Sequence, residues 1–414
     1  MVVRGLWREP DFLKLWAGQT VSQVGSWITL VGLPMTAALL LKASPFEMGI
    51  LSGAGAAAVL LFGLFAGAWA DRLRRRPILI WADLGRAAVL GTVPLAALLG
   101  RLTMSHLYLV AAASGILTVF FDVSYQAYLP SLVSAENLLE GNSKMMLSDT
   151  TAGVVGPGLT GALIAAVTAP TAILFDAISF VVSAISVWLI RKPEPPLHAS
   201  AAPHIGREIV EGLQAAWHDT ILRTLLLRSA TAAMFIGFGG SLYILFAVRE
   251  LRLPAALLGV VISVGGASGI LGALIAQKLV RRFGFGRTLI GAALLPAMAS
   301  VLPPLAHGSA LLCAAILAVA QAGDLGYSVY EINELTLRQA IAPPHVLGRV
   351  NSAAHLTFRG ILPAAALLGG ALAEVIGIRA AMLVGAGGSV LSTLWLICSP
   401  IRRLRAVPRA ASAP

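Results

Sequence analysis

The stretch GAWADRLRRRPILIWADLGRA, residues 67–87, crowds charged residues from Asp71 to Arg76 between two strongly apolar runs. Charged side chains are costly at the centre of a bilayer but favourable at the anionic inner surface of a membrane. We therefore interpret residues 71–76 as a short cytoplasmic loop that connects two membrane-spanning helices.

The composition of the whole chain supports this interpretation. Hydrophobic residues make up 57% of the 414 residues and charged residues only 12%, whereas soluble domains carry about 25% charged residues. Apolar segments of about 20 residues are long enough to cross the hydrocarbon core of a bilayer. The sequence contains twelve, near residues 15–41, 46–69, 77–99, 105–128, 142–167, 171–190, 222–248, 254–277, 287–306, 309–333, 349–374 and 378–400. We predict an all-α membrane protein.

The positions of the basic residues predict the orientation of the chain. If the N-terminus is cytoplasmic, most of the 30 Lys and Arg residues fall in cytoplasmic segments. The external segments contain only Lys42, Arg101, Arg249, Arg252 and Arg379. This asymmetry follows the positive-inside rule and predicts a multi-pass protein of the bacterial cytoplasmic (inner) membrane with both termini inside. The net charge of +11 is spread over short loops and tails, which argues against a nucleic-acid partner.

The alternation of apolar and polar segments predicts four regions. They are an N-terminal six-helix bundle (1–190), a cytoplasmic linker (191–221), a C-terminal six-helix bundle (222–400) and a basic cytoplasmic tail (401–414). In the linker, Ile209, Leu213 and Trp217 recur with helical spacing. This pattern predicts a short amphipathic helix against the cytoplasmic face of the membrane.

The two halves of the chain repeat the same pattern. The segment AWADRLRRRP, residues 68–77, matches IAQKLVRRFG, residues 275–284, and each joins the second span of its half to the third. Asn142 and Ser143 likewise precede the fifth span as Asn351 and Ser352 precede the eleventh. Such repeats predict two pseudo-symmetric six-helix bundles that rock around a central site, as in secondary transporters.

The basic loop resembles the motif between the second and third helices of the major facilitator superfamily. The matching residues are Gly67, Asp71, Arg72, Arg75 and Arg76. The resemblance implies that Asp71 meets the N-terminus of the eleventh helix, where the helix dipole favours an anion, and thereby closes the cytoplasmic side as a gate. The alternative is that the arginines only set the topology.

Other segments narrow the resemblance to one branch of this superfamily. Gly156, Pro157 and Gly161 in AGVVGPGLTG resemble the antiporter motif of drug and metabolite exporters. The segments FLKLWAGQTVSQVGSWIT, FFDVSYQAYLPSLVSAENLLEGNS and PPHVLGRVNSAAHLTFRGILPAAALLGGALAEVIG are similar to those of macrolide efflux pumps and the enterobactin exporter. This resemblance implies the major facilitator fold and a monomer in membrane lipid. It also implies alternating-access export of an amphipathic drug, macrolide-like compound or siderophore, with a proton gradient as the energy source and no cofactor.

Ionisable residues inside a span are candidates for function, because leaving them unpaired in hydrocarbon is costly. Asp324 lies about 15 residues into the tenth span and Arg359 about 10 into the eleventh, which places both near the midplane at about 1.5 Å per residue. We hypothesise that Asp324 alternates between a protonated form and an ion pair with Arg359, coupling proton entry to substrate release. A permanent structural pair is the alternative. Asp149 in the fifth span is a candidate site for cationic substrates or a gate residue.

Three further charged residues, Asp83, Arg86 and Asp122, are predicted close to the inner surface, in one salt-bridge cluster with the basic loop. We assign them a structural or gating role. Asp176, near the outer end of the sixth span, is assigned to packing.

The first span carries a polar stripe of Gln19, Ser22, Gln23 and Ser26, at positions that share one helix face. Lipid would exclude this face, so we expect it to line the central cavity or to contact the seventh helix; simple interhelical hydrogen bonding is the alternative. Trp27, Phe235 and Tyr327 are candidates for the aromatic lining of the cavity.

Other functions receive less support from the sequence. The seven His residues are scattered without ligand spacing, and the nucleotide-binding pattern GxxxxGK[ST] is absent. We therefore expect no metal site and no enzyme, and the internal repeat argues against a channel. A lipid or lysophospholipid flippase of the same fold stays open as an alternative. The substrate, the choice between proton and sodium, and the direction of transport are also open at this point.

Overall fold

The computed structural model describes residues 5–70, 73–194, 205–343 and 346–407, and the described residues contain helices and no strands. Contacts divide the chain into two compact units. Unit 1 comprises residues 1–43, 54–202 and 254–263, and unit 2 comprises residues 44–53, 203–253 and 264–414. The predicted bundle boundaries remain a prediction, and the units differ from them in one respect. The first turns of the second and eighth predicted spans pack with the other half of the chain.

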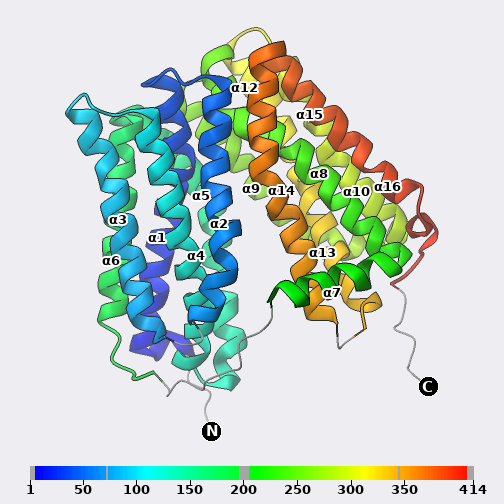
Figure 1. Ribbon diagram of the computed structural model, residues 1–414, viewed down its shortest axis with the longest axis horizontal. Coiled ribbons are helices and arrows are strands. Elements are labelled where there is room, and N and C mark those ends of the chain that lie inside the picture. Colours follow the sequence, from blue (N-terminus) through cyan, green and yellow to red (C-terminus); the bar gives the residue numbers. More distant parts are fainter. Residues whose placement is uncertain (1–4, 71–72, 195–204, 344–345, 408–414) are drawn as a thin grey trace. The chain divides into compact units, whose positions relative to one another are not determined.

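Unit 1 contains six long helices. They are α1 (Pro10–Leu39), most of α2 (Pro45–Ala70), α3 (Arg75–Leu98), α4 (Met104–Leu132), α5 (Leu138–Ala166) and α6 (Ala169–Trp188), with the short η1 (Leu6–Arg8) and η2 (Ala135–Asn137). Helix α6 packs against both α1 and α3, α5 packs against α1, and α4 packs against α3. One face of α6 thus packs against α1 and α3, and the opposite face, with Phe175, Ile178 and Ile185, is exposed at the edge of unit 1 (Figure 1).

Unit 2 is organised around the contact of α8 with α14. Its elements are α7 (Ile205–His218), α8 (Thr220–Leu245) with η3 (Phe246–Glu250), most of α9 (Ala255–Phe283), α10 (Phe285–Ala299), α11 (Leu302–Leu305), α12 (Ala310–Ala322), α13 (Asp324–Ile341), α14 (Leu347–Ile376), α15 (Ile378–Ser392), α16 (Leu394–Ile397) and η4 (Pro400–Arg403). Helix α7 occupies the position of the predicted amphipathic helix and lies across the ends of α8 and α14 (Figure 1). The carboxylate of Asp219 then caps α8 by accepting from the backbone N–H groups of Ile221 and Leu222, each at 2.8 Å.

Ten helical segments among the described residues are long and apolar enough to cross a membrane. They are Pro45–Phe62, Arg75–Leu98, Met104–Leu132, Ala169–Trp188, Thr220–Glu250, Ala255–Phe283, Phe285–Leu305, Ala310–Ile341, Leu347–Ile376 and Ile378–Ile397. The other two predicted spans form α1 and α5, which are 30 and 29 residues long. Polar residues along both helices lower their hydropathy. In α1 Gln19 and Ser22 are buried, whereas in α5 polar side chains such as Asn142 and Asp149 are exposed. The chain is therefore a multi-pass, all-α membrane protein.

The predicted tenth span, residues 309–333, lies within the helical segment Ala310–Ile341, in which one turn residue, Gly323, separates two helices. Helix α12 ends at Ala322 and α13 begins at Asp324, with Gly323 between them. A Cβ atom at position 323 would lie 2.6 Å from the Cβ of Ala299, so only glycine fits this close approach of α10. The break therefore places Asp324 at the start of a helix.

Candidate functional site

The polar stripe of α1 contacts α6 through Gln19. Gln19 and Ser22 are buried, whereas Gln23 and Ser26 are half-buried. The Gln19 Nε2 donates to Ser183 Oγ on α6 at 3.1 Å. The buried Oε1 of Gln23 has no hydrogen-bond partner. Gln19 therefore forms a hydrogen bond between helices, which was the alternative to a role in lining the cavity.

Asp176, on the face of α6 that meets α1, is fully buried. Its carboxylate accepts from the hydroxyl of Thr29 on α1 and, at 3.0 Å, from Ser179. A Cβ atom at Gly25 would lie 2.6 Å from Asp176 Oδ1. The backbone of α1 therefore covers the carboxylate directly, and a larger residue at position 25 would displace it.

Asp83 and Arg86 form a buried ion pair on α3. The Arg86 guanidinium lies between two aromatic rings, 4.3 Å from the centre of Phe121 and 4.0 Å from that of Phe180. Such stacking favours a cation when it is shielded from water. Ser183, the partner of Gln19, also lies near Asp83.

The position of this pair differs from the sequence-based placement near the inner surface. Arg86 lies 11 residues after Arg75, the first residue of the 24-residue helix α3, so it sits about 16 Å along the helix axis at about 1.5 Å per residue. The pair therefore belongs to the interior of unit 1 and contacts α4 and α6. Asp122 is exposed on α4, and its charge and that of the exposed Asp149 on α5 both act on Tyr125. Both carboxylates therefore lie near Tyr125.

The described part of the basic loop joins α3 to the end of α6. Asp71 and Arg72 lie outside the described residues, and Gly67 belongs to the last turn of α2. Arg76 donates from Nε to the carbonyl oxygen of Val187 at 3.2 Å and from Nη2 to that of Trp188. Cations are favourable at these unpaired C-terminal carbonyl groups.

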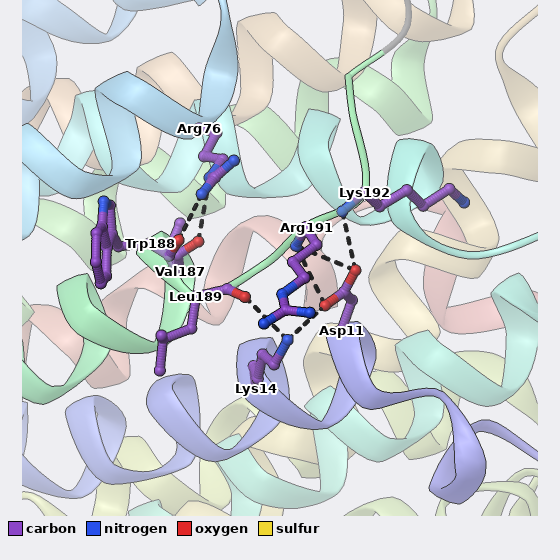
Figure 2. Close-up of polar contacts among 8 residues, drawn as sticks. All are labelled: Asp11, Lys14, Arg76, Val187, Trp188, Leu189, Arg191 and Lys192. Atoms are coloured by element: carbon purple, nitrogen blue, oxygen red, sulfur yellow. Dashed lines mark hydrogen bonds and ion pairs between the residues drawn. The ribbon is translucent and has the colours of Figure 1, made fainter.

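A second set of contacts binds the chain after α6 to α1, and Figure 2 shows it beside Arg76. The Asp11 carboxylate accepts from Lys14 Nζ at 2.7 Å and from the backbone N–H of Lys192 at 2.9 Å. Lys14 Nζ also donates to the carbonyl oxygen of Leu189 at 2.9 Å. Partial burial acts to raise the pKa of Asp11, but the hydrogen bonds from Lys14, Arg191 and Lys192 outweigh it and lower that pKa.

Glu194 completes this region by capping the other helix end. Its carboxylate accepts from the backbone N–H groups of Arg75, at 2.9 Å, and of Arg76. An anion at a helix N-terminus is stabilised by the free N–H groups and by the helix dipole. We name Asp11, Lys14, Arg76 and Glu194 the helix-end cluster. In the structure, Arg76 of the predicted gate motif is thus used to anchor α3 to α6.

The predicted antiporter motif on α5 is a close-packing surface within unit 1. A Cβ atom at Gly156 would lie 2.7 Å from the ring of Trp27, and one at Gly161 would lie 2.9 Å from the Cα of Gly259. The N–H of Gly158 donates to Ser263 Oγ at 3.0 Å. The glycines therefore let α5 approach α1 and the first turns of α9 closely. Trp27 packs on α5 through this contact.

In unit 2, Asp324 is half-buried at the start of α13. A Cβ atom at Gly265 of α9 would lie 2.6 Å from its Oδ2, so α9 passes close to the carboxylate. Arg359 is exposed on α14. No ion pair joins Asp324 to Arg359 within the described part of the chain, although the charges of both act on the half-exposed Tyr327. The hypothesis that the pair forms and breaks remains a prediction.

Phe235 of α8 contributes to packing within unit 2. Its ring centre lies 5.7 Å from that of Phe238. A Cβ atom at Gly385 of α15 would lie 2.9 Å from the Phe235 carbonyl oxygen, which places α15 directly against α8. Phe235 of α8 therefore packs against α15.

One buried ion pair of unit 2 was missed by the sequence reasoning. Glu334 and Arg338 pair on α13, and Arg338 Nη1 donates to Asn351 Oδ1 of α14 at 3.2 Å. Arg228 of α8 is also buried, 3.8 Å from the ring centre of Tyr330. The spacing of a glutamate four residues before an arginine predicts a helical ion pair. That signal was overlooked because the predicted tenth span ended at residue 333.

The comparison with known families identifies this architecture. The profile of the Major Facilitator Superfamily matches residues 15–366. The chain belongs to this superfamily. This match confirms the resemblance seen in the sequence. The chain is therefore a membrane transporter rather than an enzyme.

Several superfamily relatives match over nearly their full length. The chain is 28% identical over 389 residues to the uncharacterised MFS-type transporter YfiS of Bacillus subtilis (strain 168), covering 91% of this chain and 90% of that protein. It is 27% identical to the multidrug efflux pump Tap of Mycolicibacterium fortuitum (91% and 92%) and 25% identical to macrolide efflux protein A of Streptococcus pyogenes (95% and 96%).

Solved structures of the superfamily share the fold. The crystal structure of a bacterial homologue of the iron transporter ferroportin, in an inward-facing state, superimposes with a TM-score of 0.75. The match covers 95% of this chain and 99% of that chain at 19% sequence identity. At this identity the likeness shows the fold alone.

Proposed function

We propose that this transporter exports amphipathic small molecules, such as drugs or macrolide-like compounds, in exchange for protons by alternating access. The observation that carries the proposal is the match to a multidrug efflux pump and a macrolide efflux protein over more than nine-tenths of this chain. A siderophore is a further candidate substrate from the resemblance in sequence.

The proposal includes the membrane and the orientation. The basic residues favour a bacterial inner membrane with both termini in the cytoplasm. We expect a monomer surrounded by lipid, with a proton gradient as the energy source and no cofactor. The gate role of Gly67, Asp71 and Arg72 belongs to this proposal as well.

Asp324 is the proposed coupling residue of unit 2. It is an intramembrane carboxylate without an ion-pair partner among the described residues, and such groups mark proton pathways in transporters. Asp149, which is exposed on α5, is the proposed contact for cationic substrates.

Inside-out membrane vesicles from an efflux-deficient bacterium test the proposal. An imposed gradient with an acidic vesicle interior should drive accumulation of a cationic dye or a labelled macrolide, and a protonophore should abolish it. Vesicles without the protein serve as the control. Accumulation that ignores the pH gradient but follows a sodium gradient would contradict proton coupling, and faster movement of a labelled lysophospholipid than of any drug would favour the flippase.

A further inference from the structure

The interior of unit 1 contains an unequal number of acidic and basic groups. Asp83 and Asp176 are both 0% exposed, and Arg86 is 4% exposed. Arg86 is ion-paired with Asp83, whereas Asp176 is held by the hydroxyl groups of Thr29 and Ser179. With all three groups ionised, this cluster carries one excess negative charge.

Among the described residues of unit 1, Arg86 is the one buried Lys or Arg side chain. Lys14 of α1 pairs instead with Asp11, and Arg76 at the start of α3 donates to carbonyl groups at the end of α6. Helix α1 contributes the uncharged Gln19, Gln23 and Thr29, and α6 contributes Ser179 and Ser183.

Helix α5 contains one cation, Lys144, which pairs with Glu140 at 3.2 Å in the first two turns of that helix. His106 at the start of α4 contacts the hydroxyl of Thr92. The other titratable groups of α4 and α5 are tyrosines and the carboxylates Asp122 and Asp149. The charges that act on Asp176 are those of Arg86 and Asp83.

Two atoms of the cluster also lack hydrogen-bond partners. They are Asp83 Oδ2 and Arg86 Nε, both buried. An ionised carboxylate with a buried, unpartnered oxygen is unfavourable, because the lost hydration is not replaced. A proton on one of the two carboxyl groups removes the excess charge and leaves Arg86 paired with the other.

We propose that Asp83, Arg86 and Asp176 form a proton-binding site that holds one exchangeable proton, shared between the two carboxyl groups, and that the proton is released and taken up during transport. The coupling part of this inference rests on the proposed proton-driven export. Because the two carboxyl groups act on one another, the proton belongs to the pair rather than to either residue.

The packing of α1 provides the control of access to this site. Gly25 and Thr29 of α1 lie directly on the Asp176 carboxylate. Water reaches this carboxylate only when α1 moves away from α6. A transport step that shifts α1 therefore exposes the proton, and the return step encloses it.

Infrared titration of the purified full-length protein in nanodiscs tests the site without any substrate. The wild type should lose the carbonyl band of a buried, protonated carboxyl group as the pH is raised from about 5 to about 9, across the range open to perturbed carboxyl groups. Asp176→Asn should lack this component of the spectrum, whereas Asp324→Asn, the matched change in unit 2, should keep it. Arg86→Gln should increase the band roughly twofold, because neutrality then requires a proton on each carboxyl group.

The coupling role needs a second measurement on the same variants. In inside-out vesicles, Asp176→Asn should abolish the dependence of substrate accumulation on the pH gradient. Asp83→Asn is the second variant if Asp176→Asn fails to fold, which size-exclusion chromatography and thermal unfolding reveal.

The outcomes separate this inference from the proposed function. A protonated-carboxyl band that is absent at every pH, or that is unchanged in both Asp176→Asn and Asp83→Asn, overturns the site. Gradient-driven accumulation that stays fully intact in both variants overturns its coupling role. If the wild type shows no gradient-driven transport, the proposed function fails, and the infrared result still decides whether the cluster binds a proton.

Discussion

The two units of this transporter bury charge with opposite balance. Among the described residues of unit 1, the buried acidic and basic side chains are two carboxylates and one guanidinium, Asp83, Asp176 and Arg86. Those of the described part of unit 2 are one carboxylate and two guanidinium groups, Glu334, Arg228 and Arg338. The two units share a repeated sequence pattern, but the net charge of their buried side chains differs.

This difference determines how each unit can reach neutrality. A carboxylate becomes neutral by taking up a proton, whereas an arginine side chain keeps its proton under all physiological conditions. The excess in unit 1 can therefore be removed by a proton from water. The excess in unit 2 needs a negatively charged neighbour, and the charges of Asp324 and Glu331 act, with that of Arg228, on the same residue, Tyr327.

The largest expected effect comes from removing the single buried cation of unit 1. Arg86→Met leaves two buried carboxylates without a counter-charge and should reduce the free energy of unfolding by about 3–5 kcal/mol, the range for breaking a buried pair. Thermal unfolding in detergent measures the change. Arg228→Met in unit 2 is the matched control and should cost no more than about 2 kcal/mol, because Arg228 stacks on Tyr330 and forms no ion pair among the described residues. Equal losses in the two variants would remove the distinction between the units.

A smaller effect is expected from the carboxylate of the unit 2 pair. Glu334→Gln leaves Arg338 without its anion and adds to the positive excess, so we expect a loss of about 1.5–3 kcal/mol, typical of a hydrogen bond to a charged group. The same amide substitution in unit 1, Asp176→Asn, removes excess charge and keeps an acceptor for Thr29 and Ser179. It should change stability by less than about 1 kcal/mol. If Asp176→Asn proves the more damaging of the two in thermal unfolding, the charge balance assigned to unit 1 is wrong.

The smallest effect concerns the helix-end cluster of unit 1. Because the folded-state pKa of Asp11 is lowered, its contribution is present above the unfolded pKa and is lost as the pH falls through the folded pKa. Asp11→Asn should therefore cost up to about 1 kcal/mol at neutral pH, as expected for a partly exposed ion pair. Unfolding measured from neutral to acidic pH checks this sign. A difference between wild type and variant that grows on acidification would contradict the role of the ionised carboxylate.

Much of the fold could be predicted because membrane insertion depends on local composition. The runs of apolar residues locate the spans to within a few residues, and the basic loop and Gly156–Pro157 motif point to the superfamily that the profile match confirms. The break at Gly323 was not predicted. A Cβ atom at position 323 would meet Ala299 of α10, and hydropathy does not report such a close approach.

The candidate site was harder to predict, because it depends on which helices are neighbours. Asp176 was assigned to packing, yet it faces α1 and lies in the same buried cluster as Asp83 and Arg86. The sequence gives the distance of each charged residue along its span. It does not show which way the side chain points around the helix axis or which neighbouring helix it contacts.

The sequence by itself determined that this chain is a multi-pass transporter of helices, because hydropathy, the positions of basic residues and the short motifs are properties of local segments. Only the tertiary structure decided which charges share one low-dielectric interior. Asp83 and Arg86 belong to α3 and Asp176 to α6, and the packing of α6 between α1 and α3 brings them together. The charge of a buried cluster is a sum over helices that are distant in the chain, so it exists only once those helices have packed.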